Sequence, residues 1–142
     1  MNKIYFNTLL ELIITGHWLT DSVSRELKEC DIYEPQFNVL RILKGAKGTP
    51  ISVNTILSRM IQKSSNVTRI IDKLESKELV ERKLCSKDRR KMDIILTKKG
   101  EDLLIILNKK VEAFHKQMEN NLNKKELETL QSLILKLKGD NK

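Results

Sequence analysis

The sequence predicts one mostly α-helical domain that carries a single small β-hairpin. Only two prolines and five glycines interrupt the 142 residues, which leaves room for long helices. Charged residues make up 32% of the chain, a proportion that suits long solvated helices. Between residues 80 and 96 the helical spacing of apolar residues gives way to alternation, which is the pattern of β-strands.

The N-terminal part of the chain predicts two helices. From Leu9 to Leu27 apolar residues mostly recur every three or four positions, as they do on one face of a helix. Pro35 suits the first turn of the next helix, whose apolar face continues to Gly45. The glycines and the proline at positions 45–50 then indicate a loop.

Two shorter helices are expected after this loop. Ser52 is placed to cap the first of them, and either Ser64 or Ser65 to cap the second. The second helix has its apolar residues at i, i+3, i+4 and i+7, which predicts a buried stripe of Val67, Ile70, Ile71 and Leu74. Two short helices that each have one apolar face, separated by a tight polar turn, predict a helix-turn-helix.

Two alternating runs follow, at residues 80–84 and 92–96, and the charged segment from Ser86 to Lys91 joins them. They predict a β-hairpin, and a hairpin directly after a helix-turn-helix is a wing. We expect Cys85 to lie in a wing strand as a small apolar residue.

The last third of the chain predicts two more helices. Thr97 is placed to cap a long helix from about residue 98 to about residue 119, and Asn123 to cap the final amphipathic helix. The apolar seam expected on the long helix is Leu103, Leu107, Val111, Phe114 and Met118.

Composition narrows the classes of function. Basic residues exceed acidic ones by 27 − 19 = 8, which favours polyanionic partners. No stretch reaches the roughly 20 apolar residues of a membrane span, and Asn7 and Glu11 interrupt any signal-peptide core, so we expect a cytoplasmic protein. Cys30 and Cys85 lie too far apart for a CxxC site; we expect reduced thiols, no metal and no cofactor.

Five motifs stand in a distinctive order and spacing. They are Ser64-Ser65-Asn66-Val67-Thr68-Arg69, Asp72-Lys73-Leu74-Glu75, Leu79-Val80-Glu81-Arg82, Asp88-Arg89-Arg90 and Leu96-Thr97-Lys98-Lys99-Gly100. With them, residues 52–100 resemble the MarR family of transcription regulators. The resemblance implies a single domain over residues 1–142, with a winged helix-turn-helix lobe at 32–100 and dimerisation helices at 1–30 and 101–142.

The resemblance also implies a function. We expect a bacterial or archaeal, nucleoid-associated repressor without catalytic activity, which responds to a ligand or to stress. Like its family, it would bind a pseudo-palindromic operator in double-stranded DNA as a homodimer. One departure from the family is Glu78, which stands where members usually have Gly. Gly suits a left-handed residue at a helix end, so we expect a different or a strained helix exit here.

The helix over residues 64–77 is expected to read DNA bases, since a helix fits the major groove. Opposite the buried stripe stand the candidate DNA contacts Ser64, Ser65, Asn66, Thr68, Arg69, Asp72 and Lys73. Arg69 is the best candidate for a bidentate contact with guanine. Ser64 and Ser65 could cap the helix, contact phosphate, or do both.

The predicted wing tip concentrates positive charge. Lys87, Arg89, Arg90 and Lys91 surround Asp88, which we expect to form an ion pair with Arg90 rather than Arg89. By resemblance one wing arginine enters the minor groove; the alternative is a solvated charged hairpin. Further candidate phosphate ligands are Lys63, Lys73, Lys77, Arg82 and Lys83.

The outer helices have more apolar residues than a small lobe can cover, which indicates a homodimer. The expected dimer core is Ile4, Leu9, Leu127, Leu130, Ile134 and Leu137. A small-molecule effector is a further possible partner, and its candidate pocket is His17, Trp18, Tyr33, Phe37 and Arg41, although each of these residues could serve packing alone.

Other functions have less support. No Gly-rich phosphate loop, HExxH, GxSxG or spaced carboxylate pair indicates an enzyme. A winged helix that binds proteins or RNA would not require arginines at the wing tip together with an exposed polar helix. A membrane-surface protein would carry its basic charge on one amphipathic helix with exposed aromatics.

Overall fold

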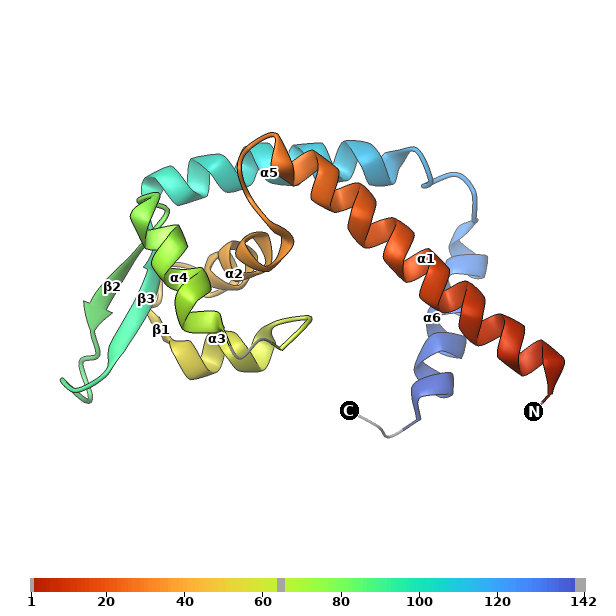
Figure 1. Ribbon diagram of the computed structural model, residues 1–142, viewed down its shortest axis with the longest axis horizontal. Coiled ribbons are helices and arrows are strands. Elements are labelled where there is room, and N and C mark those ends of the chain that lie inside the picture. The colour runs from red at the N-terminus through yellow and green to blue at the C-terminus, as the bar shows by residue number, and fades with distance from the viewer. Residues whose placement is uncertain (1, 64–65, 140–142) are drawn as a thin grey trace. The chain divides into compact units, whose positions relative to one another are not determined.

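The computed structural model describes residues 2–63 and 66–139, and Figure 1 shows its ribbon. The described residues form six helices and one three-stranded sheet, as the sequence predicted apart from the third strand. In chain order the elements are α1 (Lys3–Lys28), α2 (Glu34–Gly45), β1 (Ile51–Ser52), α3 (Val53–Arg59), α4 (Val67–Ser76), β2 (Val80–Leu84), β3 (Met92–Leu96), α5 (Lys98–Lys116) and α6 (Lys124–Lys138). The mostly helical class with a small wing is therefore confirmed.

The sheet is antiparallel in the order β1-β3-β2. The predicted wing strands β2 and β3 are both confirmed with their bounds, and Val80 pairs with Leu96 at the base of the hairpin. Strand β1 was not predicted. The placement of Cys85 in a strand was wrong: it follows β2, where its amide donates to the carbonyl of Lys91 at 3.0 Å and closes the wing loop. This backbone hydrogen bond between Cys85 and Lys91 lies just beyond the last strand pair, Leu84 and Met92.

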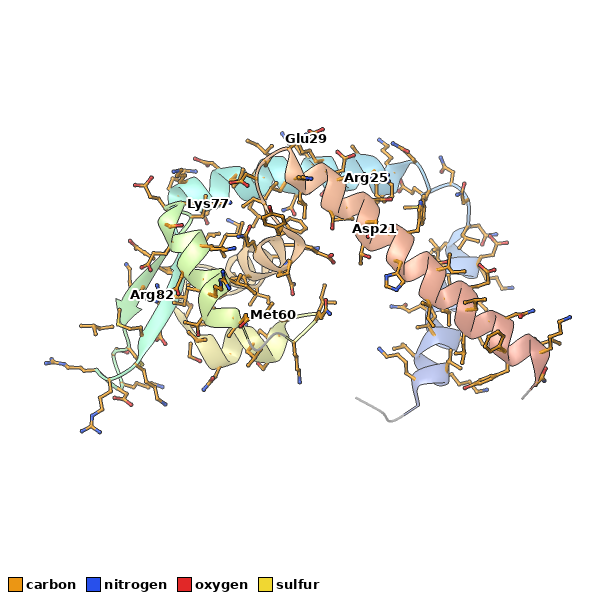
Figure 2. The ribbon with its side chains drawn as sticks, in the orientation of Figure 1. Asp21, Arg25, Glu29, Met60, Lys77 and Arg82 are labelled. Atoms are coloured by element: carbon orange, nitrogen blue, oxygen red, sulfur yellow. The ribbon has the colours of Figure 1, made fainter. Side chains whose placement is uncertain are left out.

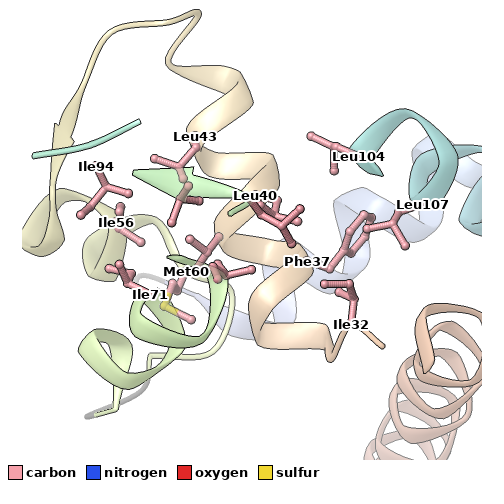
Figure 3. Close-up of a cluster of buried hydrophobic side chains, with 14 of the residues drawn as sticks. Ile32, Phe37, Leu40, Leu43, Ile56, Met60, Ile71, Ile94, Leu104 and Leu107 are labelled. Carbon is pink, nitrogen blue, oxygen red and sulfur yellow. The ribbon is translucent and has the colours of Figure 1, made fainter. Parts of the chain in front are cut away.

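The chain divides into two compact units, one that ends at Val111 and one that begins at Glu112. The first unit contains the hydrophobic core, and Figure 3 shows part of it. Phe37 and Leu40 of α2 lie in this core with Leu104 and Leu107 of α5. The buried leucine near the start of α5 is Leu104, at 2% exposure, whereas the predicted Leu103 is only half-buried.

The predicted stripe on α4 is buried in the same core. Val67, Ile71 and Leu74 are buried and Ile70 is half-buried. They meet Ile56 of α3, which is fully buried, so the two helices of the helix-turn-helix share one apolar interior.

Side-chain caps begin three of the helices as predicted. The Ser52 hydroxyl accepts from the amide of Thr55 at 3.1 Å, and the Thr97 hydroxyl accepts from the amide of Gly100 at 3.0 Å. Asn123 and Glu126 cap α6 reciprocally, with bonds of 3.0 and 2.8 Å. The cap predicted at Ser64 or Ser65 lies outside the described residues.

The exit of α4 keeps the left-handed residue that the family's glycine would supply. Glu78 has φ of 61°. Its amide donates to the carbonyl of Glu75 at 2.8 Å, and the amide of Leu79 donates to that of Leu74 at 3.0 Å. These two bonds form a Schellman motif, which satisfies the last carbonyls of the helix. The expected strain therefore resides in the left-handed backbone of Glu78.

The terminal helices expose much apolar surface. None of the residues of α6 is buried, and Leu127, Leu130 and Leu137 are each at least 42% exposed. Helix α1 exposes Ile4 at 76% and buries only Ser22 and Leu27. Among the described residues no helix has the length and hydropathy that a membrane crossing needs.

Candidate nucleic-acid interface

Helix α4 presents a polar face on the side opposite its buried stripe. Asn66, at the N-cap position, and Thr68, Arg69 and Lys73 are all exposed. The structure therefore places these four predicted residues together at the surface of the lobe. The other two candidates on this helix, Ser64 and Ser65, lie outside the described residues.

The wing stands beside α4, and Figure 1 shows its loop at the end of the β2–β3 hairpin. Lys87, Arg89, Arg90 and Lys91 are exposed on this loop. The ion pair predicted between Asp88 and the Arg90 side chain was wrong. The half-buried Asp88 carboxylate instead accepts from the backbone amide of Arg90 at 3.0 Å, which shapes the turn, and the Arg90 side chain is exposed.

Three cations that we predicted as phosphate ligands instead bind carboxylates of this chain. Arg82 of β2 forms ion pairs with Asp72 and Glu75 of α4. Lys77 contacts the carboxylate of Asp31 at 3.0 Å, and Lys83 contacts that of Glu81 at 3.4 Å. Figure 2 labels Arg82 and Lys77, near the wing and near the end of α4. Of the predicted set, Lys63 and Lys73 are exposed.

The start of α5 is bonded to the exit of α4. The Thr97 hydroxyl donates to the carbonyl of Glu78 at 2.7 Å, and the Thr97 amide donates to that of Leu79 at 3.1 Å. Lys99 binds the Glu78 carboxylate at 2.9 Å, and this bond holds the pKa of Glu78 below its ordinary value. Helix α4, the base of the wing and the first turn of α5 are thus joined within the first unit.

The comparisons with known proteins agree with this geometry. The MarR family model matches residues 32–92, which run from the residue before Tyr33 to the first residue of β3. This segment of the chain is therefore similar to the MarR family, and the structural neighbours include MarR-type transcription regulators.

Solved structures of relatives extend over nearly the whole chain. A putative MarR-like transcription regulator from Bacillus cereus is 25% identical, with a TM-score of 0.83 over 96% of this chain and 97% of that one. A mutant of MarR from E. coli is also 25% identical, with a TM-score of 0.73 over 92% of this chain and 94% of that one. MepR from S. aureus, solved in complex with DNA, shares the fold at 20% identity, with a TM-score of 0.81 over 96% and 98%.

The candidate effector residues differ in solvent exposure. Phe37 is 5% exposed, and the guanidinium of Arg41 lies 5.6 Å from the centre of its ring. His17, Trp18 and Tyr33 are exposed, Trp18 at 47% and Tyr33 at 58%. Phe37 therefore packs in the core and the Arg41 guanidinium lies over its ring, and a ligand role for all five residues stays a prediction.

One charged cluster was missed by the sequence analysis. Asp72 and Glu75, three positions apart on α4, together hold Arg82 of the neighbouring strand. Two carboxylates at this spacing lie on the same side of a helix, which was the available signal. We had assigned Asp72 to the DNA-facing surface and Arg82 to phosphate, and did not consider that they could bind each other.

Proposed function

We propose that this protein is a transcription regulator that binds a pseudo-palindromic operator in double-stranded DNA as a homodimer. The observation that carries the proposal is the occurrence of two exposed cationic features on neighbouring elements of the first unit. Arg69 and Lys73 stand on α4, and Arg89 and Arg90 stand on the adjoining wing. A relative of the same fold, MepR, has been solved with DNA, which supports the same partner for this chain.

In the proposed complex α4 lies in the major groove. Arg69 donates two hydrogen bonds to a guanine, while Asn66 and Thr68 contact neighbouring base edges near the N-terminus of the helix. Lys73 binds phosphate. Ser64 and Ser65 bring the start of this segment to the backbone of the duplex.

The wing enters the adjacent minor groove. A narrow minor groove has enhanced negative potential, and an arginine inserted there gains from it. Arg90 takes this role, because Asp88 fixes the backbone at Arg90 while the side chain stays exposed. Lys87 and Arg89 bind the flanking phosphates.

Two-fold symmetry follows from the short reach of one recognition helix, which reads few bases. The exposed apolar residues of α1 and α6 supply the interface, because a large apolar surface is costly to leave in water. The proposed dimer core is Ile4, Leu9, Leu127, Leu130, Ile134 and Leu137. Two lobes held in this way read half-sites about one helical turn apart.

We further propose repression that is relieved by a small molecule or by stress, as is typical of the family. The effector would act through His17, Trp18, Tyr33, Phe37 and Arg41. A change in the separation of the two recognition helices would then lower operator affinity.

Selection of genomic DNA fragments by the purified protein tests the proposed function. We expect enrichment of one dyad-symmetric sequence whose half-site centres are separated by about 10 base pairs. Recovery of no preferred sequence, with binding of unrelated duplexes at equal affinity, would contradict a sequence-specific regulator. Enrichment of a site without dyad symmetry would contradict the homodimer.

A further inference from the structure

Arg82 connects the wing to the recognition helix. It lies on β2 opposite Ile94 of β3, and its side chain is 23% exposed. One guanidinium nitrogen donates to the Glu75 carboxylate and another donates to that of Asp72. Both carboxylates belong to α4, so a single side chain holds the helix at two points one turn apart.

Without Arg82 the carboxylates of Asp72 and Glu75 would oppose the binding of DNA to α4. Asp72 is 57% exposed and follows Arg69 by three positions, so it lies on the same side of α4 as a proposed base contact. A carboxylate close to the phosphates of a duplex raises the energy of the complex, because like charges repel. Glu75, at 41% exposure, adds a second negative charge.

We propose that Arg82 is a positioning residue for DNA binding and is not itself a phosphate ligand. It offsets one of the two negative charges that Asp72 and Glu75 place on α4, and it fixes the base of the wing against that helix. The separation between Arg69 and the wing arginines is then set before DNA arrives, which reduces the ordering cost of binding. This inference rests on the proposed function.

The salt dependence of binding distinguishes positioning from phosphate contact. Each phosphate contact steepens the fall of affinity with salt by about one unit of the logarithmic slope. Operator affinity is measured by fluorescence anisotropy at several salt concentrations for the wild type, Arg82→Gln, Arg90→Ala and the triple variant Arg82→Gln, Asp72→Asn, Glu75→Gln. Lys109→Gln, a charge-matched change on an exposed residue of α5, is the control.

We expect Arg82→Gln to weaken operator binding about tenfold or more, which corresponds to about 1.4 kcal/mol. The reason is that the variant leaves Asp72 and Glu75 unpaired and releases the wing from α4. Its salt slope should equal that of the wild type, whereas Arg90→Ala should lower the slope by about one unit. The triple variant should recover part of the lost affinity, because the unpaired carboxylates are gone. Lys109→Gln should bind as the wild type does.

Three results would overturn the inference. These are an affinity unchanged by Arg82→Gln, a slope lowered by about one unit in that variant, and a triple variant that binds no better than the single one. If circular dichroism shows that Arg82→Gln is unfolded at the assay temperature, Arg82→Lys is measured instead. If residue 82 is a phosphate ligand, Arg82→Lys should keep the wild-type affinity. If residue 82 holds two carboxylates at once, Arg82→Lys should bind more weakly. Failure of the wild type to bind DNA would contradict the proposed function rather than this inference.

Discussion

A β-carbon on Gly100 would overlap the carbonyl oxygen of Leu79, and it would lie 2.8 Å from a methyl carbon of Leu96. The first turn of α5 therefore presses directly on the chain that leaves the recognition helix. The same Leu79 carbonyl accepts the amide of Thr97, so neither backbone can move away without losing a hydrogen bond.

Gly100→Ala should destabilise the protein. The added methyl group meets backbone, which cannot change its rotamer, so we expect a loss of about 1–3 kcal/mol, as for overpacked cores. Urea denaturation followed by circular dichroism measures it. Gly45→Ala is the matched control, since a β-carbon at Gly45 meets nothing within 4 Å. Equal stability of the two variants would contradict the close contact.

Glu78→Gly should raise the melting temperature by a few degrees. Glycine adopts the left-handed conformation at Glu78 without the steric cost of a side chain. The lost ion pair with Lys99 is exposed and contributes little. Glu78→Gln, which removes the charge and keeps the side chain, should give no such gain. A lower melting temperature for Glu78→Gly would show that the carboxylate matters more than the backbone.

The pair of Glu29 and Lys110 should give stability that depends on pH. The Lys110 ammonium donates to the Glu29 carboxylate at 2.5 Å and, with its charge, lowers the pKa of Glu29 below 4.5. The same contact raises the pKa of Lys110 above 10.5. Because the folded protein binds the Glu29 proton less readily, the stabilisation is full above pH 4.5 and is lost as pH falls through the lowered pKa. On the alkaline side, the stabilisation by this ion pair is full below pH 10.5 and is lost as pH rises through the raised pKa of Lys110.

Thermal melts of the wild type and Glu29→Gln measure this dependence. Near neutral pH the wild type should melt at the higher temperature, and the difference should shrink as pH falls through the lowered pKa of Glu29, because the carboxyl is then protonated in both states. Lys110→Met should give the same curve, because it removes the other partner. A difference that persists in acid would assign the effect to packing of the side chain.

Arg90→Ala should weaken operator binding by about 1–3 kcal/mol and leave the melting temperature unchanged, because its side chain is exposed. Arg69→Ala should weaken binding by a similar amount and also relax base preference at one position in each half-site. Anisotropy titrations on the selected operator and on single-base variants measure both effects. Unaltered affinity for Arg90→Ala would exclude the wing from the interface.

Leu130→Asp together with Ile134→Asp should convert the proposed dimer to monomers at micromolar concentration. The two charges would be buried among apolar side chains without partners. Light scattering gives the mass, and Ser132→Asp on another side of α6 is the control. A wild type that is already monomeric would contradict the proposed interface.

Local signals in the sequence predicted much of the fold. Ser52, Thr97 and Asn123 were identified as caps, because a capping side chain bonds an amide only two or three residues away. The wing strands were found with their bounds, because alternation is a property of neighbouring residues. The two-residue strand β1 was missed, since nothing in so short a run predicts its pairing with Ile94 and Asp93.

Contacts between distant residues were predicted less well. The partners of Arg82 lie seven and ten positions away on another element, so charge alone suggested phosphate instead. On α5 the periodicity could not decide between Leu103 and Leu104, and only packing against α2 makes the second the buried one. The predicted end of α5 near residue 119 was late, since the helix ends at Lys116.

Ser52 has two structural roles at once: it pairs with Asp93 in the sheet, and it caps α3. No linker therefore separates the first helix of the helix-turn-helix from the hairpin, and neither can rotate alone. In the proposed regulator, a signal that releases the operator would therefore move the helix-turn-helix and the wing of each protomer together. Such a movement would change the distance between the two lobes of the proposed dimer and leave the shape of each lobe as it is.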